Sequence, residues 1–83
     1  MKEKDIDLSE YNPFELDLKT RREDGYMVST IKFKRTGPYE TAIVCEDFIK
    51  IVEVYYTKEK AIQGHEEYCS MSTYAIEHLE SIE

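Results

Sequence analysis

The chain has 83 residues, of which 41% are hydrophobic and 35% are charged, and its formal net charge is −7. A chain of this length forms a single domain, residues 1–83, and buries only about 60% of its unfolded surface, so a homodimer would supplement its small core. Binding to phosphate backbones needs a surplus of Lys and Arg, so the acidic balance argues against direct nucleic-acid binding. No apolar run has the length of a membrane-spanning helix. The residues after Met1 lead into no apolar stretch, so we expect no signal peptide. Two cysteines are too few for a disulfide scaffold, which favours a cytoplasmic location.

Residues 1–25 are polar, with scattered apolar positions. Apolar residues alternate with polar ones on both sides of a turn signal at Asn12-Pro13. They are Ile6, Leu8, Phe14, Leu16 and Leu18. The pattern fits short strands, and it fits equally an extended arm that packs on the body of the protein or on a partner. We therefore predict that residues 1–25 form an extended N-terminal arm or short strands.

Residues 26–57 predict a three-stranded antiparallel meander. The expected strands cover 26–35, 39–45 and 48–56, and the chain turns between them at 36–38 and 46–47. In the first strand Met27, Ile31 and Phe33 share one face, whereas Thr30, Lys32 and Lys34 share the other. In the third strand the alternation slips around Ile51 and Val52, which predicts a bulge or burial on both sides.

Thr57 is suited to be the N-cap of one long amphipathic helix over residues 58–82. The side of this helix that would face the sheet carries Ala61, Ile62, His65, Tyr68, Cys69, Ser72, Ile76 and Leu79. Gly64 in the helix interior predicts a close approach to another backbone. The stretch 70–73 is the weakest part of the helix, and a break there is the alternative. The predicted fold class is therefore α+β, with the C-terminal helix packed on one face of the meander.

The candidates for metal binding are Cys45, His65 and Cys69, since His65 and Cys69 lie four residues apart on one side of the helix. No fourth ligand is evident, and the alternative is that each packs in the core. We predict that His65 is structural. The sequence offers no nucleophile, base and orienting residue in combination, and no glycine-rich phosphate loop. We therefore expect a protein that is not an enzyme and uses no cofactor.

Four glutamates fall along one edge of the predicted helix: Glu59, Glu66, Glu77 and Glu80. The charges of this helix oppose its dipole, because Lys58 and Lys60 lie in the first turn and acids lie in the last. We interpret the acidic edge as a binding surface for a basic protein partner. The alternative is that the acids only keep the protein soluble.

The segment from Val28 to Glu67 resembles a group of small uncharacterised proteins encoded by bacteriophages and prophages. The shared pieces are Val28-Ser29-Thr30, Tyr39-Glu40-Thr41 and Ala61-Ile62-Gln63-Gly64-His65-Glu66. The chain departs from the group in its short loop at 36–38 and in its longer helix. The resemblance implies a phage setting inside a host cell, and it implies no activity.

These features favour a non-catalytic acidic protein-binding module of phage type, which would inhibit a host nucleic-acid-handling or defence protein that has a basic surface. A structural homo-oligomer or virion accessory protein is the alternative. A small metal-binding sensor that uses Cys45, His65 and Cys69 is the second alternative.

Overall fold

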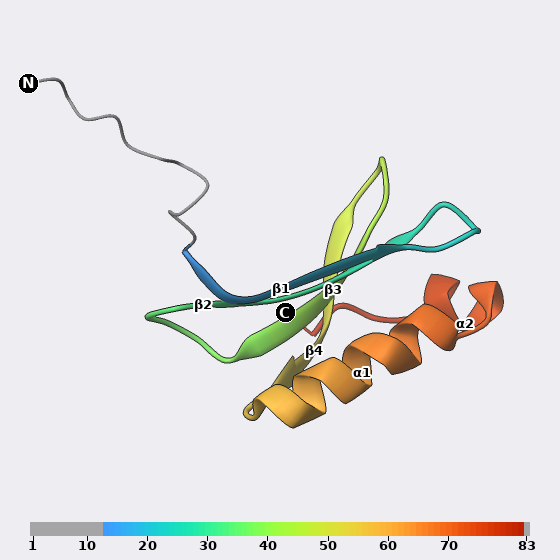
Figure 1. Ribbon diagram of the computed structural model, residues 1–83. Coiled ribbons are helices and arrows are strands. Elements are labelled where there is room, and N and C mark those ends of the chain that lie inside the picture. The colour runs from blue at the N-terminus through green and yellow to red at the C-terminus, as the bar shows by residue number, and fades with distance from the viewer. Residues whose placement is uncertain (1–12, 83) are drawn as a thin grey trace, which may run out of the picture.

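The computed structural model describes residues 13–82 and shows a four-stranded antiparallel sheet with two helices on one of its faces (Figure 1). The elements are β1 (Phe14–Arg21), β2 (Met27–Phe33), β3 (Tyr39–Val44), β4 (Ile49–Tyr55), α1 (Lys58–Ser70) and α2 (Thr73–Glu77). The strand order is β1-β2-β3-β4, so strands that follow each other along the chain are neighbours in the sheet. The α+β class, the antiparallel sheet and the C-terminal helical segment are confirmed.

The prediction of three strands is wrong, because residues 14–21 of the expected arm form β1. This strand pairs with β2 from Phe14↔Phe33 to Arg21↔Met27. The side chains of β1 alternate between the two faces of the sheet, as in any half-buried strand. Leu16 is buried against the helix, and its neighbours in the strand are exposed. The strands are joined by a tight turn in which Gly25 has φ +94°, a conformation that favours glycine. Residues 1–12 of the predicted arm lie outside the described residues.

The prediction of one helix over 58–82 is also wrong, because α1 ends at Ser70 and α2 begins at Thr73. Thr57 is confirmed as the first N-cap, since its side chain accepts a hydrogen bond from the amide of Lys60 at 3.2 Å. The side chain of Ser72 does the same for Ala75 at 3.1 Å. A serine stabilises a helix start better than a helix interior, so the break falls where local side-chain hydrogen bonds compete with the helix.

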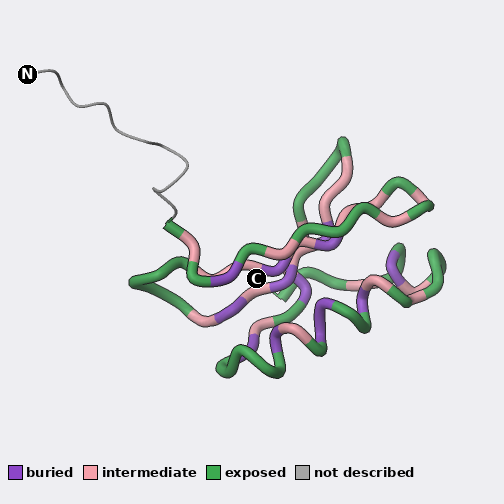
Figure 2. Tube along the Cα trace, in the orientation of Figure 1, coloured by how far each residue is buried: buried purple, intermediate pink, exposed green. Residues whose placement is uncertain are grey.

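The core lies between the sheet and the helices (Figure 2) and forms two clusters. Its buried apolar members are Val28, Ile43, Val52, Tyr68 and Ile76 in one cluster, and Leu16, Tyr39, Tyr55 and Ala61 in the other. The predicted bulge in β4 is confirmed, because the register with β3 shifts so that Val52 is the extra residue. Neither helix of the described part is long and apolar enough to cross a bilayer.

Candidate functional site

A chain of polar side chains, buried except at Thr20, joins α1 to three strands through His65. The His65 Nε2 atom lies 3.0 Å from Thr20 Oγ1 on β1, and its Nδ1 atom lies 2.7 Å from Thr30 Oγ1 on β2. Thr30 Oγ1 in turn lies 2.6 Å from Thr41 Oγ1 on β3. Thr30 and Thr41 are fully buried, and His65 is 5% exposed. The predicted position of His65, on the sheet-facing side of the helix, is confirmed, and both of its ring nitrogens are bonded to threonine hydroxyls.

Burial lowers the pKa of His65 below its usual value, so the neutral ring is favoured in the folded protein. A neutral imidazole has one N–H donor and one acceptor nitrogen, and a threonine hydroxyl can supply either role. The cluster therefore satisfies His65 without a charge. This arrangement ties the helix to the sheet and leaves no ring nitrogen for a ligand.

Gly64, the residue before His65, allows the ring of Tyr55 to lie against α1. A Cβ atom at Gly64 would lie 2.2 Å from Tyr55 Oη. The predicted close approach exists, but the neighbour is a side chain and not another backbone. The hydroxyls of Tyr55 and Tyr68 both donate to Glu53, at 3.5 and 2.8 Å. Burial, followed by the neighbouring carboxylate, raises the pKa of both tyrosines, so both remain protonated donors.

The segments Val28–Thr30, Tyr39–Thr41 and Ala61–Glu66 meet at this helix–sheet contact. Their buried residues are Val28, Thr30, Tyr39, Thr41, Ala61, Gly64 and His65. In this chain the residues of those segments therefore pack the helix onto the sheet.

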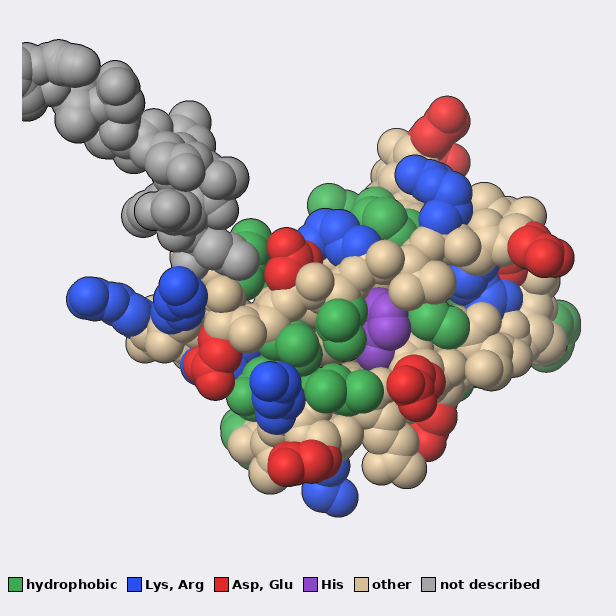
Figure 3. Space-filling model, in the orientation of Figure 1, with side chains coloured by type: hydrophobic (Ala, Val, Ile, Leu, Met, Phe, Trp, Pro, Cys, Tyr) green, Lys and Arg blue, Asp and Glu red, His purple; other side chains and the backbone are tan. Residues whose placement is uncertain are grey.

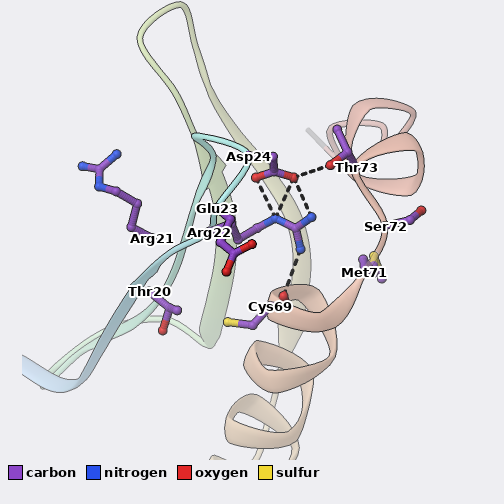
Figure 4. Close-up of a pocket in the computed structure, with 9 residues that line it drawn as sticks. All are labelled: Thr20, Arg21, Arg22, Glu23, Asp24, Cys69, Met71, Ser72 and Thr73. Atoms are coloured by element: carbon purple, nitrogen blue, oxygen red, sulfur yellow. Dashed lines mark hydrogen bonds and ion pairs between the residues drawn. The ribbon is translucent and has the colours of Figure 1, made fainter.

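A second polar cluster lies at a pocket beside the turn between β1 and β2 (Figure 4). The Arg22 guanidinium donates to both carboxylate oxygens of Asp24, at 2.6 to 3.1 Å. It also donates to the backbone carbonyls of Tyr68 and Cys69, at 2.8 and 3.0 Å, and so caps the end of α1. Asp24 accepts a further hydrogen bond from the Thr73 hydroxyl of α2, at 2.7 Å. The cluster clamps the turn to both helices across the break.

The Arg22 guanidinium holds the pKa of Asp24 well below its usual range, and the Asp24 carboxylate raises the pKa of Arg22. The side chains are 8% and 15% exposed, so solvent screens this ion pair only partly. Neither polar cluster is predictable from local sequence patterns. Both join segments about 45 residues apart, as in Thr20 with His65, and no local pattern reveals such a contact.

The three metal candidates do not come together. Cys69 and His65 line one groove between β1 and α1, but the nitrogens of His65 are bonded to threonines. Cys45 lines a different pocket, with Tyr26 and Glu77. Within residues 13–82 no three His, Cys, Asp or Glu side chains are placed to hold a metal ion.

The groove between β1 and α1 has a volume of about 490 Å³ and lies on the side of the molecule seen in Figure 3. It is lined by Leu18, Lys19, Thr20, Ile62, His65, Glu66, Cys69 and Ser70. Figure 3 shows apolar side chains gathered around a histidine on this side, with acidic side chains nearby. Glu66 is one of the residues that line this groove, and it is exposed.

All four glutamates predicted to bind a partner are exposed, but they do not lie along one helical edge. Glu59 and Glu66 are two turns apart on the same side of α1. Glu77 ends α2, where it accepts a hydrogen bond from the Tyr26 hydroxyl at 3.1 Å, and Glu80 follows α2. The break between the helices separates the two pairs, so the continuous acidic edge is absent.

The face of the sheet opposite the helices, which we call the open face, is apolar over three strands. Residues paired across antiparallel strands share a face, so the buried pair Val28 and Ile43 marks the helix side. The rows on the open face are Met27–Val44–Ile49, Ser29–Ala42–Ile51 and Ile31–Glu40–Val54. Their members are partly exposed, except Ile49, which is 73% exposed. Met27, Ile31 and Phe33 do share a face, as predicted, but it is the open one.

The strand β1 gives the open face a charged margin. Arg21, Lys19 and Asp17 of β1 pair with Met27, Ser29 and Ile31, so they extend the three rows. Lys19 and Asp17 also form an ion pair with each other. The open face is thus charged on β1 and mainly apolar on the other strands, where Glu40 is the one charged residue in the three rows.

No protein-family model matches the chain, and neither a curated protein nor a solved structure matches it. Function is therefore inferred from the geometry of the described residues. The two polar clusters use their groups in hydrogen bonds within the chain, whereas the acids of α1 and the open face are directed outward.

Proposed function

We propose that the protein is a non-catalytic acidic module that binds a basic protein surface through the exposed side of α1. The observation that supports this proposal is that the exposed acids of α1 form no ion pair within the described residues. The ion pairs of residues 13–82 are Lys19–Asp17, Arg22–Asp24 and Lys32–Glu15. None of them involves an acid of α1. The carboxylates of Glu59, Glu66 and Glu67 are exposed and have no ion pair or hydrogen bond within the described part.

The proposed partner is a protein that displays Lys and Arg, because these residues complement unpaired carboxylates and speed association. The net charge of −7 makes a phosphate backbone an unfavourable partner. Together with the resemblance to phage proteins, this suggests a target among the nucleic-acid-handling or defence proteins of a host cytoplasm, since their surfaces are basic. The module would inhibit such a target by covering that surface.

A structural homo-oligomer is the second candidate, and the apolar open face is the observation that favours it. The two candidates are compatible, since α1 and the open face lie on opposite sides of the sheet (Figure 1). A protein could therefore bind a partner on one side and a second copy on the other.

The proposal is tested by affinity capture from a bacterial lysate with wild-type protein and two charge-reversal variants. Glu59→Lys/Glu66→Lys changes α1, and Glu46→Lys/Asp47→Lys makes the same change of net charge on the loop between β3 and β4. We expect the control to retain the protein captured by the wild type and the α1 variant to lose it. Capture should weaken as NaCl is raised, because salt screens exposed charges.

Equal loss in the two variants would mean that capture follows net charge alone. Full capture by the α1 variant would mean that the partner binds elsewhere. Either result contradicts a binding site on α1.

A further inference from the structure

We propose that the outer edge of β1 and the groove beside it bind an extended segment of the basic partner, which adds to the sheet as a further strand. The proposal rests on the function proposed above and adds the form in which the partner binds. β1 is the first strand in the sheet order, so within the described residues only β2 pairs with it. Such an edge is a template for a strand from another chain, whose main-chain hydrogen bonds provide affinity.

The register of β1 shows which of its backbone groups are directed outward. In an antiparallel pair, every second residue bonds the neighbouring strand, and the residues between direct their N–H and C=O away from it. The Arg22 amide donates to the Tyr26 carbonyl at 2.7 Å, and the pairing from this bond back to Leu16 is uninterrupted. The alternation therefore leaves three residues whose backbone groups are directed outward. They are Asp17, Lys19 and Arg21.

The groove between β1 and α1 lies beside this edge. Leu18, Lys19 and Thr20 line it from β1, and Ile62 and Glu66 are among the residues that line it from α1. Leu18 and Ile62 are partly exposed, so an apolar side chain that entered the groove would cover apolar surface. The side chains of a strand alternate between two faces, so every second residue of an added strand would enter the groove.

The acids of α1 favour a basic segment in this groove. Glu59, Ile62 and Glu66 follow one another at spacings of three and four residues, which places them on one side of the helix. Ile62 and Glu66 line the groove, so this side of α1 faces it. Both glutamates are exposed and have no ion pair within the described part. A segment with Lys or Arg on both sides of an apolar residue would complement this row.

The separation of the two glutamates suits an extended chain. Glu59 and Glu66 lie two turns apart on a helix that rises about 1.5 Å per residue, so they are about 10 Å apart along its axis. Residues four apart in a strand point to the same face and are about 13 Å apart. Long Lys and Arg side chains cover the difference. Basic residues two places before and two places after the apolar residue would therefore reach both glutamates.

The side chains of β1 on the open face favour the same pattern. Asp17, Lys19 and Arg21 lie on that face, and Lys19 is already paired with Asp17. A basic residue of the added strand on that face would lie beside Arg21, where like charges repel. The partner segment should therefore alternate, with neutral polar residues on the open face and basic, apolar and basic residues in turn on the groove side.

The probe for this site is the synthetic peptide Thr-Arg-Thr-Val-Thr-Arg-Thr, with blocked ends and a fluorescent label. Fluorescence anisotropy with the full chain should show saturable binding that weakens as NaCl is raised. Two further peptides carry backbone N-methyl groups, one on its threonines and the other on its arginines and valine. Methylation removes N–H donors and keeps every charge. Only one set of N–H groups faces β1 in an added strand, so one methylated peptide should bind roughly tenfold more weakly and the other like the parent.

A matched pair of variants tests the edge from the side of the protein. Lys19→Pro removes one outward N–H and no hydrogen bond to β2, and proline is accepted at such positions of edge strands. Lys19→Ala makes the same change of charge and keeps the N–H. We expect the proline variant to bind the parent peptide roughly fivefold more weakly than the alanine variant, with an unchanged far-UV circular dichroism spectrum. If the proline variant does not fold, the methylated peptides test the same hydrogen bonds on the wild type.

Failure of strand addition can be distinguished from failure of the proposed function. Equal binding of the two methylated peptides, or no binding of the parent peptide, would overturn strand addition. If the methylated peptides bind equally and Glu59→Lys/Glu66→Lys loses them both, binding to the acids of α1 stands without an added strand. Full binding of the parent peptide by this charge-reversal variant would overturn the basic character assigned to the segment. A wild-type dimer that Lys19→Pro converts to a monomer in analytical ultracentrifugation would assign the edge to a second copy of the chain and overturn the proposal.

Discussion

The substitution Gly64→Ala tests the contact on which the packing of α1 depends. A Cβ atom at this position would lie 2.2 Å from Oη, 2.5 Å from Cε1 and 2.5 Å from Cζ of Tyr55. Ordinary van der Waals contact begins at 3.4 Å, so the ring would have to move by about 1 Å. Tyr55 is 6% exposed and its hydroxyl is bonded to Glu53, so it has little room to move.

Two effects of opposite sign determine the result. Alanine is favoured over glycine in a helix interior by about 1 kcal/mol. Forcing an extra methyl group into a packed site costs about 1–3 kcal/mol, and the hydrogen bond of Tyr55 would be strained as well. We expect the cost to exceed the gain, with a net loss of about 1–2 kcal/mol in the free energy of unfolding.

Urea denaturation followed by circular dichroism, at one fixed protein concentration, measures this change. The matched background is Tyr55→Leu, which removes the crowding atoms. There the same Gly64→Ala change should stabilise the protein by up to about 1 kcal/mol, because only the helix preference remains. A higher denaturation midpoint for Gly64→Ala in the wild-type background would refute the reasoning, since Tyr55 would then yield without cost.

Two further predictions concern the polar clusters. Asp24→Asn should lower the free energy of unfolding by about 2 kcal/mol, because Arg22 would lose its charged partner in a largely buried site. Asp17→Asn, in the exposed ion pair with Lys19, is the control and should change the free energy of unfolding by less than about 0.5 kcal/mol. The pKa of Asp24 is lower in the folded state than in the unfolded state. Its contribution to the free energy of unfolding is therefore present above its unfolded pKa of about 3.9 and is lost as pH falls below that value. Equal loss of stability in acid for Asp24→Asn and the wild type would contradict this. The pKa of His65 is also lowered on folding, so below about pH 6.5 the unfolded chain binds a proton that the folded chain does not, and stability should fall as pH falls through this window. Chemical denaturation at several pH values in this range should show that the free energy of unfolding depends less on pH in His65→Gln than in the wild type. The same dependence on pH in both proteins would exclude His65 as its source.

Local signals in the sequence predicted most of the fold. The turn at Gly37-Pro38 and the N-cap at Thr57 were identified from neighbouring residues, and the structure contains both. A bulge was one of two explanations for the slipped alternation around Ile51 and Val52, and the structure has a bulge there. Such features depend on contacts within a few residues, so the sequence reveals them. β1 was not committed to as a strand, because the alternation of Phe14, Leu16 and Leu18 gave equal support to an extended arm.

The sequence predicted a helix break only as an alternative. It did not predict that the break would separate the four glutamates of the candidate site. An apolar stripe continues across Ser70 and Thr73, so the pattern alone favoured one helix. The continuous acidic edge depended on that single helix. Once Ser72 starts a second helix, Glu77 no longer follows Glu66 along one surface, and the role of the C-terminal acids becomes a question separate from that of α1.

The face that each strand turns toward the helix could not be obtained from polarity alone, because two threonines, Thr30 and Thr41, are buried beside the apolar core residues on that side. In β2 the fully buried residues are Val28 and Thr30, whereas the apolar residues Met27 and Ile31 lie on the other face. Burial of Thr30 is tolerated since its hydroxyl is bonded to both His65 and Thr41, and a buried polar group costs little when its hydrogen bonds are made. A strand has two faces, so committing Thr30 to the helix side commits Met27 and Ile31 to the other. The satisfied polar cluster under α1 and the apolar open face are therefore consequences of one register.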